Sequence, residues 1–350
     1  MVHMRIVAPR EVSEQALGML RESGSVCNVI WLPGAAQEPA GDVILADVAR
    51  EDASVTLSDL KELDIHRTGS IALESVETQI SLFAERAVER ARGSEADAVV
   101  WEEVESRTSE QVELSGTYLL FIVLAALIAA VGIFLNSPIL IVGAMVVGPE
   151  FGPIAGFCVA FVQRRRHLAA RSLVALAAGF SLAITAVYLT THAFRITGLT
   201  PSEFTERSHS LSNVISSPDF FTFFVAACAG VAGMLSLSTA KSGALIGVLI
   251  SVTTIPAAAN IGVAAAYGDW HAWRGSIGQL AINLTSIMAA GTATLYVQRL
   301  LYRRRRVRHL RDPSRAAAGL EIGRSRRRVA KAPSRSSSGR AQKGWSASQI

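Results

Sequence analysis

The sequence predicts an α-helical polytopic membrane protein of about six spans with a soluble α+β domain at its N-terminus. Apolar residues make up 50% of the 350 residues, but they gather between residues 117 and 300. There they form segments of roughly 20 residues, the length that a helix needs to cross a bilayer. Residues 1–116 instead carry 22 acidic and 10 basic residues, and strand-like and helix-like segments alternate there.

Residues 1–105 are predicted to form the α+β domain, whose location is expected to be cytoplasmic because no signal-peptide pattern precedes it. Ser13 is expected to open one helix, and Thr56 with Asp59 a second, because these residue types cap helix N-termini. β-rich stretches predict strands at residues 4–9, 26–34, 42–49 and 70–77. The order β-α-β-β-α-β is that of a ferredoxin-like sandwich. Residues 97–104 are expected to add an edge strand, and residues 106–116 to form a linker.

Neither the cysteines nor the acidic residues indicate a metal or cofactor. The cysteines Cys27, Cys158 and Cys228 lie too far apart for a recognisable disulfide or metal-binding pattern. The nearest approach to an acidic cluster is Asp42, Asp47, Glu51 and Asp52. Nothing in their spacing fixes a coordination geometry, so a solvated surface is the favoured interpretation over a metal site.

Six apolar segments are expected to span the membrane. They are residues 117–135, 136–162, 168–191, 219–237, 243–267 and 277–297. Lys and Arg gather at alternate ends, at residues 164–171, at Lys241 and at residues 303–306. Because positive charge favours the cytoplasmic side, both termini are predicted to be cytoplasmic and the protein to lie in the bacterial inner (cytoplasmic) membrane.

Residues 301–350 are predicted to be a basic, disordered tail. From residue 299 onward the chain holds 16 Lys or Arg and two acids, with too few apolar residues to fold alone. Two interpretations stay open: contact with anionic lipid, or a solvated segment that fixes the topology. Nucleic acid is not an expected partner, since no aromatic residues alternate with the charges.

The second and fifth apolar segments are both interrupted near their middle. Gly148, Pro149 and Pro153 break the second, and Pro256 breaks the fifth. A shift of 104 residues places the two breaks side by side, and it also pairs Ser172 with Ser276. A unit of three spans that occurs twice must be inverted because three is odd. The layout therefore predicts a 3+3 inverted repeat.

Paired broken segments in inverted halves indicate a binding site near the membrane midplane. Glu150 strengthens this prediction, because an acid inside a membrane normally faces a partner or water. The candidate translocation or binding residues are Asn136, Ser137, Gly148, Pro149, Glu150, Pro153, Thr253, Thr254, Pro256, Asn260 and Asn283. Alternatives stay open: the glycines can serve helix packing, Asn136 and Ser137 can cap a helix, and Glu150 can lie near a membrane surface in a re-entrant pair.

Several motifs resemble a known family of bacterial membrane proteins. NSPILIVGAMVVGPEFGPI, SVTTIPAAANIGVA, GDW at 268–270 and NLTSI at 283–287 occur in the order found in the family called domain of unknown function 389, over about residues 117–300. DVAREDAS and GSIALES resemble the soluble part of actinobacterial-type members. Many relatives have Leu-Met where this chain has Glu150 and Phe151, and two prolines where it has Ile255 and Pro256. The resemblance implies the architecture and no activity.

Two functional hypotheses follow. The first is a transporter or channel for a small solute or ion, with the acidic domain as a regulatory or oligomer-forming unit. The second is a non-transporting membrane sensor or scaffold that acts through the N-terminal domain. An enzyme is not expected, because no HExxH, GxSxG or phosphate-binding glycine loop is present. The expected partners are the lipid bilayer and further copies of the chain.

Overall fold

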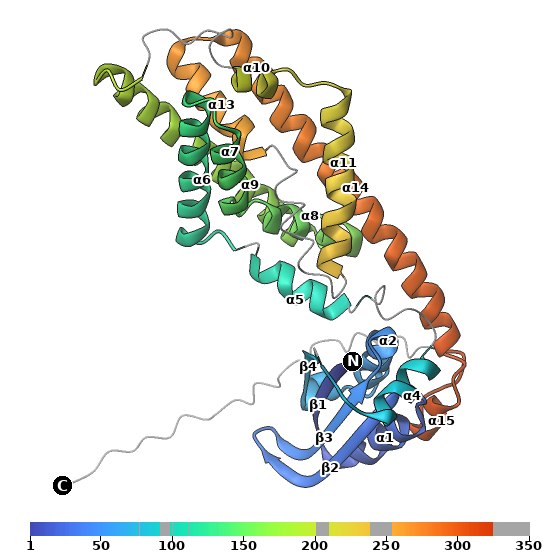
Figure 1. Cartoon of the computed structure of the whole chain (residues 1–350). Helices are drawn as coiled ribbons and strands as arrows, with labels where there is room; N and C mark the ends of the chain where they lie inside the picture. The colour runs from blue at the N-terminus through green and yellow to red at the C-terminus, as the bar shows by residue number, and fades with distance from the viewer. Residues whose placement is uncertain are drawn as a thin grey trace, which may run out of the picture.

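The computed structural model describes residues 1–76, 78–91, 99, 101–111, 113–200, 210–238 and 254–324. An α+β domain lies at one end, and a bundle of long helices extends from it (Figure 1). The domain contains the strands β1 (Val2–Ala8), β2 (Val26–Gln37), β3 (Ala40–Val48) and β4 (Ser70–Ser75), and the helices α1 (Arg10–Glu22), α2 (Arg50–Glu62), α3 (Ile65–Thr68) and α4 (Leu82–Arg90).

The four strands form one antiparallel sheet in the order β2-β3-β1-β4. Side chains of a strand alternate between its faces, and in β1 the buried set is Val2, Met4, Ile6 and Ala8. These residues pack with Leu17 and Leu20 of α1 and with Leu60 of α2 in one core. The predicted order of strands and helices is therefore present.

Both predicted helix caps are wrong. The helix α1 begins at Arg10, and the Ser13 hydroxyl donates to Asp42 Oδ2 at 2.6 Å instead of capping the helix. The helix α2 begins at Arg50, six residues before Thr56, so Thr56 and Asp59 both lie inside it. Residues 101–104, expected as an edge strand, begin a helix. Ser13 and Asp59, which were expected to cap helices, instead bind residues that are distant in the sequence.

Three of the four acids assigned to a solvated surface are buried: Asp42, Asp47 and Glu51. Asp42 accepts hydrogen bonds from Ser13, from the Gly34 N–H and from Trp31. The Ser13 and Gly34 hydrogen bonds hold the pKa of Asp42 below its usual value, against the opposing effect of burial. This carboxylate therefore fixes the β2–β3 hairpin against α1. The described residues contain no group of His, Cys, Asp and Glu suited to a metal ion.

The bundle consists of long apolar helices, some of which are broken. The helices after the sheet are α5 (Trp101–Gln111), α6 (Gly116–Phe134), α7 (Pro138–Val147), α8 (Phe151–Gln163), α9 (Arg166–Ile196), α10 (Ser210–Ser216), α11 (Phe220–Ser238), α13 (Thr254–Tyr267), α14 (Trp270–His309) and α15 (Ser314–Ala317). Within the described residues, α6, α9, α11 and α14 are long and apolar enough to cross a membrane, and the bent pair α7 and α8 makes a fifth if counted as one span. Of the expected span 243–267, the structure describes only residues 254–267.

The helix α14 does not end at residue 300, where the membrane region was expected to stop. It continues to His309 and reaches the α+β domain (Figure 1). Residues 310–324 then turn back along the domain, and Ala318 and Leu320 join the core formed by the sheet, α1 and α2. The first part of the expected tail is thus helical or packed, and residues 325–350 lie outside the described residues.

A buried network of charges ties α14 to the α+β domain. The Arg306 guanidinium contacts Asp59 at 2.6 Å and Glu62 at 2.7 Å. Arg315, which is 0% exposed, pairs with the same two acids, and His309 Nε2 lies 2.8 Å from Asp59 Oδ2. Burial raises the pKa of Asp59, but the hydrogen bond with His309 and the two guanidinium charges outweigh it, so the pKa is lowered overall.

The helix α5 lies between the domain and the bundle (Figure 1) and packs against α8. Trp101 stacks edge-on against Tyr302 of α14, with ring centroids 6.5 Å apart. Arg50 of α2 forms a 2.9 Å ion pair with Glu103, and Arg165 pairs with Glu105 at the C-terminal end of α8. The α+β domain is therefore joined to the bundle through both α5 and α14.

Replacing Arg315 with Met should destabilise the full chain by about 3–5 kcal/mol, the usual effect of removing one member of a buried ion pair. Arg311→Met is the matched control, because Arg311 is an exposed neighbour. The depressed pKa of Asp59 means that its stabilisation is complete above its ordinary pKa of 3.8 and is lost as the pH falls through the lower folded value. Thermal unfolding should show a difference between wild type and Arg315→Met that persists at neutral pH and shrinks only in stronger acid. Equal melting temperatures for the two Met variants would contradict the role of the network.

Candidate functional site

The bent pair α7 and α8 owes its break to Gly148 and Pro149. The helix α7 starts with Pro138 at its first position and ends at Val147, with Gly148 as its C-cap. Pro149 has no N–H, so the Met145 carbonyl cannot receive the next helical hydrogen bond. The helix α8 starts again at Phe151 at an angle of 50° to α7. Pro153 is in the first turn of α8, where a backbone N–H would have no acceptor within the helix.

Glu150 lies at this break, well inside the bundle. The ten residues of α7 span about 15 Å, half of the roughly 30 Å thickness of a bilayer's hydrocarbon core. The Glu150 side chain is only 2% exposed. One carboxylate oxygen, Oε1, accepts a 2.7 Å hydrogen bond from the Thr254 hydroxyl. The other, Oε2, is buried without a hydrogen-bond partner in the described part of the chain.

Gly148 allows the two broken segments to meet. A Cβ at this position would lie 2.3 Å from Glu150 Oε2 and 2.8 Å from Ile255 Cγ1. Thr254 and Ile255 are the first residues of α13 that the structure describes, and Pro256 follows them, buried in the same helix. The break after α7 is therefore in direct contact with the first described residues of α13, through one hydrogen bond and one close approach of the backbone.

Glu150 and Thr254 are 104 residues apart, and the same interval recurs along the bundle. The helices α6 and α11 both have 19 residues and start at Gly116 and Phe220. The helices α9 and α14 start at Arg166 and Trp270. Every buried residue of α8, from Phe151 to Val162, has a buried counterpart 104 positions later in α13. Both the helix positions and their buried faces repeat.

Two arginines repeat in the same way. Arg299 of α14 donates to the Val162 carbonyl at the end of α8, and Arg195 of α9 donates to the Ala266 carbonyl at the end of α13. Arg195 also lies over the Tyr267 ring, 4.5 Å from its centroid. Donors and acceptors are again 104 residues apart. A cation at a helix C-terminus is stabilised by the free carbonyls and the helix dipole.

Asn260 belongs to a separate buried cluster. Its amide oxygen accepts a 2.8 Å hydrogen bond from the Ser212 hydroxyl, and its amide nitrogen donates to Ser276 Oγ at 2.8 Å and to the Ser212 carbonyl. The side chain thus joins α10, α13 and α14. Because its donors and its acceptor are used within the protein, the arrangement favours a structural role for Asn260 over ligand binding.

Asn136 and Ser137 do not reach Glu150. They precede α7, so the whole helix separates them from the break. The Asn136 amide is exposed, donates to Ser210 and accepts from the Leu211 N–H, which fastens the α6–α7 turn to α10. Ser137 is the N-cap residue of α7 but makes no side-chain capping hydrogen bond.

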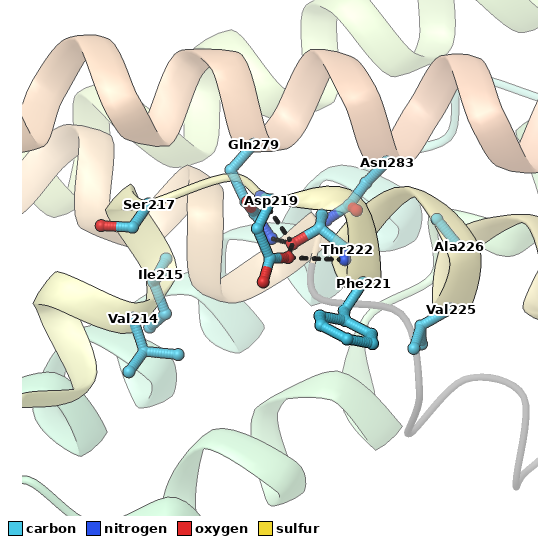
Figure 2. A pocket seen from close by; sticks show the side chains of 10 residues that line it. All are labelled: Val214, Ile215, Ser217, Asp219, Phe221, Thr222, Val225, Ala226, Gln279 and Asn283. Carbon is cyan, nitrogen blue, oxygen red and sulfur yellow. Dashed lines mark hydrogen bonds between the residues drawn. The ribbon is translucent and has the colours of Figure 1, made fainter.

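Asn283 lines a cavity of about 450 Å³ between α10, α11 and α14. Figure 2 shows Asn283 and Gln279 on α14 opposite Thr222 and Asp219. Gln279 donates to Thr222 Oγ1 at 3.4 Å, and Asp219 Oδ1 accepts from the Thr222 N–H and hydroxyl at 2.8 and 2.9 Å. This cavity contains neither Glu150 nor Asn260 among its lining residues.

The repeat explains the cavity. Thr222 is the counterpart of Tyr118, whose hydroxyl donates to the Ala175 carbonyl at 3.2 Å. The tyrosine also packs against Gly179, the counterpart of Asn283. A large aromatic side chain fills this place in the first half, and a threonine leaves it open in the second. These two places, 104 residues apart, therefore differ in the side chains that line them.

The structure thus brings four of the predicted residues together where the break after α7 meets α13: Gly148, Pro149, Glu150 and Thr254. Pro256 is buried two residues further along α13. Pro153 is one turn further along α8, and Thr253 lies outside the described residues. The prediction missed Tyr118, Arg195 and Arg299. The 104-residue shift contained the signal for the two arginines, because it pairs Arg195 with Arg299.

Comparison with known proteins places the break within a region that matches a protein family. Residues 145–289 match the family model described as domain of unknown function (DUF389). The predicted resemblance is therefore confirmed over that region. The DUF389 match includes Glu150, Thr254, Asn260 and Asn283, and it leaves out Asn136 and Ser137.

The uncharacterised protein MJ0678 of Methanocaldococcus jannaschii is 25% identical over 205 residues, which cover 57% of this chain. The alignment spans 61% of that relative's length. No solved structure matches the chain.

Gly148→Ala should destabilise the protein by about 1–3 kcal/mol, because the added methyl group crowds the Ile255 side chain of α13. Gly143→Ala, in the same helix, is the control: a Cβ there meets nothing within 4 Å. Thermal unfolding in detergent should show a lower melting temperature for Gly148→Ala alone. An equal loss in both variants would show that the effect comes from α7 itself and not from the contact with α13.

Proposed function

We propose that the chain is an integral membrane transporter or channel for a small solute or ion, built from two inverted repeats of three spans. The observation that supports this most strongly is the hydrogen bond between Glu150 and Thr254, which occupy the same position in the two halves. Broken helices that meet near the middle of a bilayer are the usual location of a transporter's binding site. The proposal counts residues 243–267 as a broken fifth span.

The arginine contacts support the inversion. In a repeat related by an axis in the membrane plane, equivalent contacts lie at opposite faces of the membrane. The Arg299–Val162 contact is at the end of the bundle near the α+β domain, beside the start of α9. The Arg195–Ala266 contact is at the other end of α9. The two parts of the bundle also pack against each other, because α8 and α13 each contact both α9 and α14.

The proposed location is the bacterial inner membrane with both termini in the cytoplasm, from the distribution of Lys and Arg. Arg306 is used by the network around Asp59, whereas Arg303, Arg304 and Arg308 are exposed. We propose that these three exposed side chains contact anionic lipid headgroups at the end of α14.

We infer that the α+β domain is ferredoxin-like, from its element order and its sheet order, and that it regulates the bundle. The contacts through α5 and α14 support a regulatory role, since any ligand or partner of the domain acts on helices that also pack on α8. The same contacts fit the second hypothesis, a non-transporting sensor or scaffold. Flux measurements separate the two.

Purified wild-type protein in proteoliposomes should conduct at least one of sodium, rubidium, chloride or protons faster than protein-free vesicles. Glu150→Gln and Thr254→Val should reduce this flux at least about tenfold, as expected when a stabilising interaction of about 1.4 kcal/mol is lost on the pathway. Asn136→Ala is the matched control, because Asn136 is a polar residue of the same segment that the structure places away from the break.

Three results would count against transport at this site. Equal flux in wild type and Glu150→Gln would remove Glu150 from the pathway. Equal losses in Asn136→Ala and Glu150→Gln would indicate a general effect on folding. Flux no greater than that of empty vesicles for all four ions would favour the sensor or scaffold hypothesis.

A further inference from the structure

The Glu150 carboxylate has one oxygen that the protein does not satisfy. Oε1 is bound by Thr254, whereas Oε2 has no hydrogen-bond partner in the described chain although the residue is 98% buried. A buried carboxylate without a positively charged partner is unfavourable in such a place. The unsatisfied oxygen is therefore an observation that a ligand would explain.

The groups around Oε2 provide no positive charge. No Lys, Arg or His among the described residues forms an ion pair with Glu150, and the negative charge of Glu150 acts on the Tyr118 hydroxyl of α6. Oε2 instead lies beside Gly148, the C-cap of α7. The last carbonyls of a helix carry the negative end of its dipole, and Pro149 leaves the Met145 carbonyl without its helical donor.

The local chemistry therefore favours a cation over an anion. A carboxylate, a threonine hydroxyl and helix-terminal carbonyls are the oxygen ligands that hard cations prefer. One negative side chain matches a single positive charge. We propose that Glu150 Oε2, Thr254 Oγ1 and the C-terminal carbonyls of α7 form a binding site for one monovalent cation, either a proton held on the carboxyl group or an alkali-metal ion held by these oxygens.

This assignment deepens the proposed function by naming its substrate or coupling ion. It rests on that function for the transport of the ion but not for its binding. Binding is measured on the full chain in detergent, without any flux. If the protein binds the cation but does not transport it, the cation site is supported and the transport function is contradicted. If the Glu150→Gln variant still transports, the cation site is contradicted and the transport function is supported.

The proton is tested by infrared difference spectroscopy between low and high pH. Relative to Glu150→Gln, wild type should show one additional protonated carboxyl band that disappears as the pH rises. The alkali-metal ion is tested by replacing choline chloride with sodium or potassium chloride at equal ionic strength. Here the wild-type melting temperature should rise by a few degrees, as it does when a ligand binds the native state alone.

Thr254→Val keeps the carboxylate and removes one ligand oxygen, which makes it the second variant in case Glu150→Gln fails to fold. It should weaken alkali-metal binding by about tenfold and leave the carboxyl band in place. Asp219→Asn, an exposed acid at the start of α11, is the control and should behave as wild type. The proposal is overturned if Glu150→Gln retains the band and the cation-dependent shift, or if wild type shows neither.

Discussion

The bundle depends on one constraint: interrupted backbone inside a low-dielectric environment must find partners within the protein. The segment that contains Gly148 and Pro149 meets this constraint by packing its break against the beginning of α13. The hydrogen bond from Thr254 to Glu150 closes the contact. The helices α9 and α14 then surround the pair, each contacting both α8 and α13. The break after α7 therefore lies buried against α13 in the described part of the bundle.

The sequence was most informative where a pattern depends on position along the chain. The spacing of glycines and prolines located the break, and the 104-residue shift related the two halves before any contact was known. Sequence reasoning did not separate the residues that meet at the break from those that only share its segment. Asn136 and Asn260 belong to apolar stretches of the sequence, as Glu150 does, but they form hydrogen bonds with α10, and Asn260 also with α14. Such partners are set by packing between distant helices, which one-dimensional spacing does not encode.

In the α+β domain, too, the contacts between residues distant in the sequence could not be predicted. Its strand and helix order followed from local propensity, but Thr56 and Asp59 resembled a helix start and lie within α2. Asp59 instead receives Arg306 and Arg315 from a segment that is about 250 residues later in the chain. A basic tail read alone looks unable to fold, because its apolar residues are few. Ala318 and Leu320 are nevertheless buried, because they pack in the core of the acidic domain.

The continuity of α14 has a mechanical consequence. Its 40 residues make a rod of about 60 Å, with one end beside Asn260 and Ser276 and the other in the Asp59 network. A rigid rod amplifies rotation with distance from its pivot. A tilt of about 5° around the first end displaces the other by about 5 Å over this length. An angular change among the packed helices is thus converted into a translation at the α+β domain, and a force applied to that domain acts on the bundle with the same mechanical advantage.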